Sequence, residues 1–243
     1  ALSSAASDVY KRQLVERVAG RVPLLMGCGG NNTAAVVKDL KEGDWSGIDG
    51  ILSVCPYYNK PSQEGLYQHF KTVSEHSPLP IILYNVPGRT GVNMTAATTI
   101  RIAGDFPNVI GIKEASGKID QIQEILDWRS RDFLVLSGDD ALTLDLMSRG
   151  ADGVISVTSN CCPGLVSEMV RNAQSDKFEI AKSIHNKLLP IFGALFCESN
   201  PIPIKYVMGI MGYGNGSPRL PLTPLSESGR AILDPILKDL GIA

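Results

Sequence analysis

Short apolar runs alternate with amphipathic or turn-rich stretches through the first two thirds of the 243-residue chain. Six of these runs have the length of a buried strand, and they occupy residues 22–26, 50–54, 80–84, 109–113, 133–136 and 153–157. Apolar runs bounded by turn residues are typical of strands that are buried on both faces, and helical patterns between them indicate βα units. The spacing of roughly 20 to 30 residues predicts a parallel sheet of the α/β class, in a (β/α) barrel.

The barrel pattern is incomplete on its amino-terminal side. A closed TIM (β/α)8-type barrel has eight βα units, and two units beyond the six visible ones need about 45 to 55 residues. Only 21 residues precede Val22. We therefore expect a TIM-type barrel that lacks its first two strands.

The pattern changes to helices alone in the last third of the chain. Helical periodicity covers residues 175–196, 202–212 and 225–240. No evident linker separates these helices from the preceding units, which favours an extension of the same body over an independent domain.

Three segments are therefore expected. Residues 14–174 form the partial barrel, and residues 175–243 form a helical extension packed on it. Residues 1–13 match neither module, and we interpret them as a non-native amino-terminal segment.

Composition and charge argue against several classes of partner. The net charge of −2 and the lack of a basic cluster with interleaved aromatic residues disfavour nucleic acid and anionic membranes. No apolar run approaches the about 18 residues of a membrane span. Five cysteines without paired metal-ligand spacing indicate reduced thiols in a cytoplasmic protein: Cys28, Cys55, Cys161, Cys162 and Cys197.

A lysine ends the fourth apolar run. Lys113 follows Val-Ile-Gly-Ile, a strand expected to be buried on both faces. Loss of solvation lowers the pKa of an ammonium toward the range in which the neutral, nucleophilic amine is populated, as a Schiff-base lysine requires. A lysine whose ammonium extends from the strand end into water is the alternative for a single example.

Further reactive residues are expected beside this lysine. The carboxyl ends of parallel strands meet at one edge of the sheet. Tyr84 ends the third run and Arg89 follows on the next loop, which gives a proton shuttle, an amine nucleophile and a carboxylate clamp. Asp139 and Asp140, after the fifth run, are expected to cap a helix, and imine chemistry needs no metal and no cofactor.

Five motifs in order along the chain resemble the dihydrodipicolinate synthase and N-acetylneuraminate lyase family of pyruvate-dependent class I aldolases and lyases. The resemblance extends from about Leu14 to the C-terminus. The motifs are PYYNKPSQEG at 56–65, YNVPGRTG at 84–91, GIKEA at 111–115, LSGDD at 136–140 and NPIPIK at 200–205.

The resemblance implies a role for each residue of the site. Lys113 forms an imine with pyruvate, Tyr84 transfers protons, and Tyr58 completes the proton relay by reaching in from a neighbouring subunit. The active unit is then a homo-oligomer, at least a dimer and typically a dimer of dimers. Gly138 and Ile155 contribute backbone groups and a wall near the pyruvate.

Arg89 bears on the second substrate. A guanidinium at this position suits the carboxylate of L-aspartate 4-semialdehyde better than a polyhydroxylated chain. The implied reaction is the synthesis of 4-hydroxy-tetrahydrodipicolinate on the diaminopimelate route to lysine. Two alternatives stay open: another pyruvate aldolase that acts on a keto-sugar acid or hydroxy-oxoglutarate, and a catalytically silent paralogue that serves as a binding or oligomerisation module. Retention of the tyrosines, the arginine and the lysine argues against the silent paralogue.

The sequence departs from the family in two respects. The Gly-Thr-Thr-Gly-Glu segment, whose threonines bind the pyruvate carboxylate, is absent, so we expect the 243-residue chain by itself to be inactive or poorly folded. Asn31 and Tyr57 match positions of the family's lysine-binding allosteric site. Ala35 stands where inhibited members have glutamate, which argues against feedback by lysine.

Overall fold

The computed structural model describes residues 4–242, and residues 1–3 and 243 lie outside the described part. The chain divides into two compact units, residues 1–136 and 137–243. Strand order in the sheet follows the order in the sequence, β1-β2-β3-β4-β5-β6, and the pairs from β1 to β4 are parallel. The expected α/β fold with six strands is confirmed, whereas the absence of two further strands stays a prediction.

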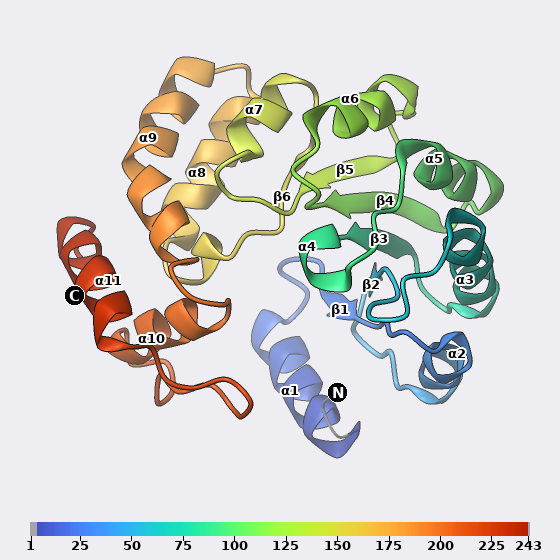
Figure 1. Ribbon diagram of the computed structural model, residues 1–243, viewed down its shortest axis with the longest axis horizontal. Coiled ribbons are helices and arrows are strands. Elements are labelled where there is room, and N and C mark those ends of the chain that lie inside the picture. Colours follow the sequence, from blue (N-terminus) through green and yellow to red (C-terminus); the bar gives the residue numbers. More distant parts are fainter. Residues whose placement is uncertain (1–3, 243) are drawn as a thin grey trace. The chain divides into compact units, whose positions relative to one another are not determined.

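The first unit alternates strands with helices after an amino-terminal helix (Figure 1). Helices α2, α3, α5 and α6 pack against one another in sequence order. The elements are α1 (Ser4–Val18), β1 (Leu25–Gly27), α2 (Thr33–Glu42), β2 (Gly50–Val54), α3 (Gln63–His76), β3 (Ile81–Asn85), α4 (Pro87–Thr90), α5 (Ala96–Asp105), β4 (Val109–Glu114), α6 (Ile119–Trp128) and β5 (Leu134–Ser137), whose last residue belongs to the second unit.

The second unit is mainly helical. Its elements after β5 are α7 (Thr143–Ser148), β6 (Gly153–Val154), the 3-10 helix η1 (Thr158–Asn160), α8 (Pro163–Gln174), α9 (Phe178–Ala194), α10 (Ile202–Ile210) and α11 (Glu227–Asp239). The three helices predicted in the last third of the chain are thus present as α9, α10 and α11.

Both faces of β3 are buried, as the sequence predicts. Successive side chains of a strand point to opposite faces of the sheet. Ile81, Leu83 and Asn85 on one face are fully buried, and Ile82 on the other face is 2 % exposed. Tyr84 shares the face of Ile82 and is the one residue of the strand that is partly exposed.

Polar side chains cap three helices of the first unit, α2, α3 and α5. The side chain of Asn32 accepts hydrogen bonds from the backbone N–H groups of Ala34 and Ala35, at the start of α2. Ser62 caps α3 and Thr95 caps α5 in the same way. Each cap satisfies backbone donors that a helix leaves unpaired, and fixes where the helix begins after its loop.

Two of the predicted strands differ from the structure by more than one residue at an end. The first was expected from residue 22, but β1 begins at Leu25, because Pro23 has no N–H to donate to a ladder and the N–H of Leu24 donates to the Asp49 side chain instead. The sixth was expected to reach residue 157, but β6 ends at Val154. The carboxylate of Asp140 accepts hydrogen bonds from the backbone N–H and hydroxyl of Thr158, at 2.8 and 2.7 Å, and this places the following residues in a 3-10 helix.

The expected segment boundaries also differ from the division of the structure. Residues 174 and 175 lie within the second unit, where α8 packs against α9 and Met169, Ala173 and Ala181 share one buried cluster. The boundary expected at residues 13 and 14 falls inside α1, and residues 1–3 of that segment lie outside the described part. The assignment of the chain to a partial barrel and an extension stays a prediction.

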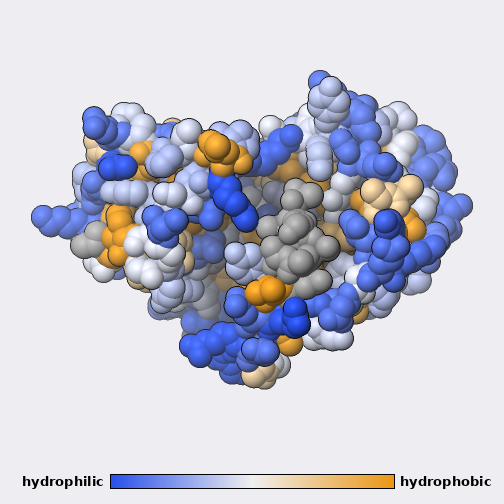
Figure 2. Space-filling view, turned by 90° about the horizontal axis from the view of Figure 1, so that it is seen from below, coloured by the Kyte–Doolittle hydropathy of each residue, from blue (hydrophilic) through white to orange (hydrophobic). Residues whose placement is uncertain are grey.

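Polar and charged residues cover most of the face in Figure 2, where hydrophobic residues form separate patches. Such scattered apolar exposure is normal for a globular surface. Within residues 4–242, no helix has the length and apolar character to cross a membrane.

Candidate active site

Lys113 and Tyr84 lie opposite each other on adjacent parallel strands. They are register partners of β4 and β3, and the Nζ atom of Lys113 lies 4.2 Å from the centroid of the Tyr84 ring. Both side chains are partly exposed. The structure therefore brings together the predicted amine nucleophile and the predicted proton shuttle.

The Tyr84 phenol is held in the protonated form that a proton donor needs. Burial raises the pKa of the Tyr84 phenol above its ordinary value, and the positive charge of Arg89 opposes this rise. The phenol stays protonated at neutral pH, so it has a proton to give to a developing oxyanion or leaving hydroxide. The effect of the guanidinium on this pKa also shows that Arg89 acts on the same region.

Arg89 is held by a short helix directly after β3. Helix α4 begins with Pro87, whose fixed φ suits the first helical turn, and ends at Gly91 with φ of 76°. The side chain of Arg89 is exposed. An exposed guanidinium beside the Lys113 and Tyr84 pair is suited to bind the carboxylate of an incoming substrate.

Tyr58 extends away from its own chain. Its side chain is 88 % exposed, and its backbone has φ of 73°, the left-handed region that costs a non-glycine residue about 1 kcal/mol or more. Lys60, two residues later, has φ of 47°. The structure does not pack Tyr58 into a site of its own chain, and the strained loop projects the phenol outward.

Asn31 and Tyr57 lie on adjacent loops of the first unit. The side-chain amide of Asn59 donates to the carbonyl oxygen of Asn31 at 3.0 Å, which ties the loop after β1 to the loop after β2. Tyr57 is 43 % exposed. Ala35 lies in the first turn of α2, where it offers no charged group.

Gly138 and Ile155 lie in the second unit. Gly138 follows the end of β5, and the backbone N–H of Ile155 donates to the carbonyl oxygen of Ser137 at 3.0 Å. Next to them, Asp139 Oδ1 accepts from the backbone N–H groups of Ala141 and Leu142, in the turn before α7. Helix α7 itself begins after Leu142 without a side-chain cap, so the helix-capping role predicted for Asp139 and Asp140 is wrong: Asp139 closes a turn, and Asp140 accepts from Thr158. Within the described residues there is no group of three or more metal-ligating side chains.

Sequence reasoning missed the residue pair directly behind the site. Asn85 follows Tyr84, Glu114 follows Lys113, and the two are register partners with 0 and 1 % of their surface exposed. Burial raises the pKa of the Glu114 carboxyl, and hydrogen bonds from Asn85 and neighbouring donors oppose this rise. A polar residue at the end of each of two buried runs was the available signal.

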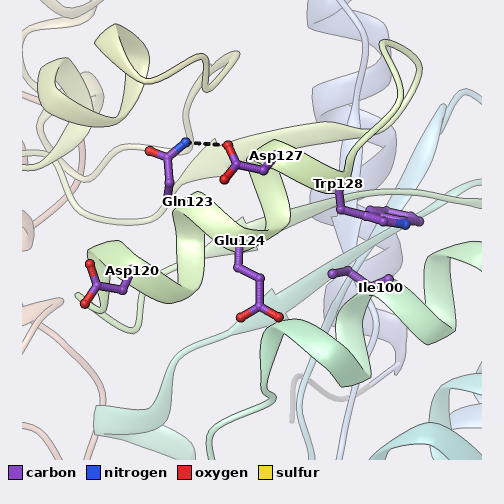
Figure 3. Close-up of a pocket in the computed structure, with 6 residues that line it drawn as sticks. All are labelled: Ile100, Asp120, Gln123, Glu124, Asp127 and Trp128. Carbon is purple, nitrogen blue, oxygen red and sulfur yellow. Dashed lines mark hydrogen bonds between the residues drawn. The ribbon is translucent and has the colours of Figure 1, made fainter.

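A groove on the helical layer lies apart from these residues. It is lined by Ile100 of α5 and five residues of α6, which are Asp120, Gln123, Glu124, Asp127 and Trp128 (Figure 3). None of the residues predicted to act in catalysis lines this groove, so we do not assign it to the active site.

Comparison with known proteins decides the family. The dihydrodipicolinate synthetase family matches residues 3–240 of the chain. The chain belongs to this family. The assignment made from the five motifs is confirmed, and with it the enzyme class, the pyruvate-dependent class I lyases.

Curated dihydrodipicolinate synthetase relatives cover nearly the whole chain. A 4-hydroxy-tetrahydrodipicolinate synthase of Phocaeicola vulgatus is 48 % identical over 237 residues, which are 96 % of this chain and 80 % of that protein. A synthase of the same name from Bacillus subtilis is 46 % identical over 226 residues, 93 % of this chain and 78 % of the relative.

Solved dihydrodipicolinate synthase structures share the fold. The enzyme of Thermotoga maritima aligns with a TM-score of 0.91 at 45 % identity, covering 95 % of this chain and 81 % of the other. The enzyme of Aquifex aeolicus aligns with a TM-score of 0.95 at 41 % identity, covering 99 and 82 %.

Proposed function

We propose that this chain carries the site of a 4-hydroxy-tetrahydrodipicolinate synthase, which condenses pyruvate with L-aspartate 4-semialdehyde on an imine of Lys113. The observation that carries this proposal is the position of Lys113 Nζ, 4.2 Å from the ring centroid of Tyr84 at the carboxyl ends of two adjacent parallel strands. The names of the relatives supply the product, 4-hydroxy-tetrahydrodipicolinate, and the family resemblance of the sequence implies the two substrates.

The first half of the reaction builds a nucleophile from pyruvate. The neutral amine of Lys113 attacks the keto carbon, and a proton moves from nitrogen to oxygen to give a carbinolamine. Tyr84 donates a proton to its hydroxyl, which leaves as water and forms the iminium. Loss of a proton from the pyruvate methyl group to the regenerated base gives the enamine.

The second half of the reaction uses the aldehyde. The enamine carbon attacks the aldehyde carbon of the semialdehyde, and the new alkoxide takes a proton from the relay. The amine of the semialdehyde then adds to the imine carbon and closes the ring, and expulsion of the lysine amine releases the cyclic product and regenerates Lys113. In each step the electron pair passes to the imine nitrogen of Lys113 or to an oxygen that takes up a proton, so we infer that no metal or organic cofactor takes part.

Arg89 is the proposed clamp for the second substrate. Its exposed guanidinium follows β3 and acts electrostatically on Tyr84, so an anion bound to it lies beside the reacting centre. Gly138 and Ile155 are the proposed backbone and wall contacts of the pyruvate. Asn31 and Tyr57 are proposed only as the remnant of an effector site.

Tyr58 is the proposed contribution of a second copy of the chain. Its side chain is 88 % exposed on a strained loop, which suits a phenol that inserts into a neighbouring subunit. One solved relative, aligned with a TM-score of 0.91, is described as a monomeric dihydrodipicolinate synthase variant. For this chain we propose a homo-oligomer, a dimer or a dimer of dimers.

Two further expectations complete the proposal. The buried thiols of Cys28, Cys55, Cys161 and Cys162 suit the reducing cytoplasm, where we place the enzyme.

We also propose that the six-stranded sheet is part of an eight-stranded barrel. Its activity is then best measured on an extended chain, in which a segment with the Gly-Thr-Thr-Gly-Glu motif precedes Leu14.

The test of the function compares acceptors on the extended chain. Pyruvate-dependent consumption of L-aspartate 4-semialdehyde supports the proposal, and equal or faster turnover of sugar aldehydes contradicts it in favour of another pyruvate aldolase. Lys113→Ala is expected to abolish turnover. Lys118→Ala, which removes an exposed lysine five residues along the chain, is the matched control and leaves turnover unchanged.

A further inference from the structure

Strands β3 and β4 end in two successive pairs of opposed residues. Tyr84 lies opposite Lys113, and Asn85 lies opposite Glu114 one position later. Because side chains alternate along a strand, the second pair points to the face opposite the reacting residues. An ionisable carboxyl, 1 % exposed, is therefore buried directly behind the proposed imine site.

Glu114 is held by three donors. The side-chain amide of Asn85 donates to both carboxylate oxygens, at 3.2 and 3.1 Å. The backbone N–H of Ser116 donates to Oε1 at 2.7 Å, and the side-chain amide of Gln121 donates to Oε2 at 3.1 Å. The carboxylate thus links β4 to β3, to its own following loop and to helix α6.

Asn85 extends the same network to a third segment. Its Oδ1 atom accepts from the backbone N–H of Met94 at 3.0 Å, and its amide donates to the Met94 carbonyl oxygen at 3.2 Å and to Asn93 Oδ1 at 3.0 Å. The backbone carbonyl of Asn85 accepts from the N–H of Ala115 at 2.9 Å. The residue therefore joins β3 to β4 and to the loop that precedes α5.

Such a network is a costly way to fill a protein interior. A buried carboxyl with its hydrogen-bond partners commonly stabilises a fold no better than well-packed apolar residues of the same volume, because the charge must be taken out of water. What the network does supply is a fixed geometry, since each donor and acceptor accepts only a narrow range of positions.

We propose that Glu114 and Asn85 are the positioning residues of the imine site, which hold the ends of β3 and β4 so that Lys113 Nζ stays over the ring of Tyr84. The catalytic part of this inference rests on the proposed function, because it takes Lys113 as the imine-forming residue. Small displacements of a nucleophile from its reacting geometry slow a reaction strongly. A network that keeps Lys113 in place therefore increases the rate of imine formation.

Two substitutions are designed to break the hydrogen-bond network of Glu114 and Asn85. Glu114→Gln keeps the size of the side chain but replaces an acceptor by an amide donor, which faces the amide donors of Asn85 and Gln121. Asn85→Ala removes the link between the strands. The matched control is Asn108→Ala at the opposite end of β4, where the Asn108 amide donates to the Ser74 carbonyl oxygen at 3.0 Å and the Ser74 hydroxyl donates to Asn108 Oδ1.

The position of Lys113 is read by NMR on the extended chain. Lysines are dimethylated with 13C-formaldehyde, and the Lys113 signal is assigned by its loss in Lys113→Arg. Because Nζ lies over the Tyr84 ring, its methyl signal is expected upfield of exposed lysines, and Tyr84→Leu removes that shift. Glu114→Gln and Asn85→Ala are expected to move the signal to the exposed-lysine position, while Asn108→Ala leaves it in place.

The second readout is the rate of pyruvate trapping by borohydride on the extended chain, measured well below the unfolding midpoint of every variant. Glu114→Gln and Asn85→Ala are expected to slow trapping about 10- to 100-fold. Asn108→Ala, with a comparable loss of stability, is expected to leave the rate near that of the parent.

The outcomes separate the inference from the proposed function. An upfield Lys113 signal that persists in both Glu114→Gln and Asn85→Ala overturns the positioning role. Equal losses of the signal in all three variants also overturn it, because they reveal a general loss of structure. If the parent shows the shifted signal but pyruvate is never trapped on Lys113, the proposed function fails and the NMR result alone decides the positioning role.

Discussion

The backbone N–H of Tyr58 donates a hydrogen bond of 3.2 Å to the carbonyl oxygen of Thr90. This bond joins the loop that follows β2 to the short helix that carries Arg89. The exposed phenol of Tyr58 and the exposed guanidinium of Arg89 therefore lie on two adjacent segments that are held together by this hydrogen bond. Their placement depends on the bond between the loops and on the left-handed backbone at Tyr58.

Removal of the Tyr58 hydroxyl is expected to slow catalysis without changing the fold. Tyr58→Phe keeps the ring and the backbone strain but breaks the proposed proton relay, so kcat of the extended chain is expected to fall about 100-fold. Tyr57→Phe, on the adjacent and half-exposed tyrosine, is the matched control and is expected to leave kcat unchanged. A Tyr58→Phe enzyme with the kcat of the parent contradicts the relay.

Arg89 is expected to act on the second substrate alone. Arg89→Ala is expected to raise KM for L-aspartate 4-semialdehyde at least about tenfold, equivalent to ~1.4 kcal/mol of lost binding, and to leave pyruvate trapping intact. Arg101→Ala, which removes an exposed arginine paired with Glu64 on the helical layer, is the control. Equal effects of Arg89→Ala on both substrates would show that the guanidinium is not a clamp for the semialdehyde.

The residues of the site that could be predicted from the sequence are those at the ends of apolar runs. Lys113 and Tyr84 stand out in sequence because a reactive residue ends an apolar run, and parallel strands bring such ends together. Asn85 and Glu114 follow them directly, but their burial depends on helix α6 and on the loop at Met94, which no local pattern in the strands reveals. The network therefore emerges only from the tertiary fold.

The short sixth strand shows a second limit. Residues 153–157 have the apolar pattern of a strand, but the hydrogen bonds from Thr158 to Asp140 draw the chain into a 3-10 helix. A contact between residues 18 positions apart overrides the local preference. The division of the chain after Leu136 was unpredictable for a similar reason, since α8 and α9 share a buried cluster across the expected boundary.

Burial of His69 predicts a loss of stability in acid. The Thr33 hydroxyl lies 2.8 Å from its Nδ1 atom, and desolvation lowers the pKa of the ring from 6.5 to about 4. The unfolded chain binds a proton more readily, so the stabilisation is present above pH 6.5 and is lost as the pH falls toward 4. The free energy of unfolding is expected to drop by about 3 kcal/mol over this range from His69 alone.

The measurement is urea unfolding as a function of pH, for the parent chain and for His69→Gln. Carboxyl groups titrate in the same range in both proteins, so the difference between the two curves isolates the histidine. The difference in unfolding free energy is expected to shrink from pH 6.5 to pH 4. Parallel curves would show that His69 is not buried as a neutral ring.

The most direct test of the account is the location of the pyruvate adduct. The extended chain is incubated with pyruvate and borohydride, digested, and mapped by mass spectrometry. The account predicts a reduced pyruvate adduct on Lys113 and none on Lys118 or in the Lys113→Ala variant. An adduct on a different lysine, or one that persists in Lys113→Ala, contradicts the assignment of Lys113 as the imine-forming residue.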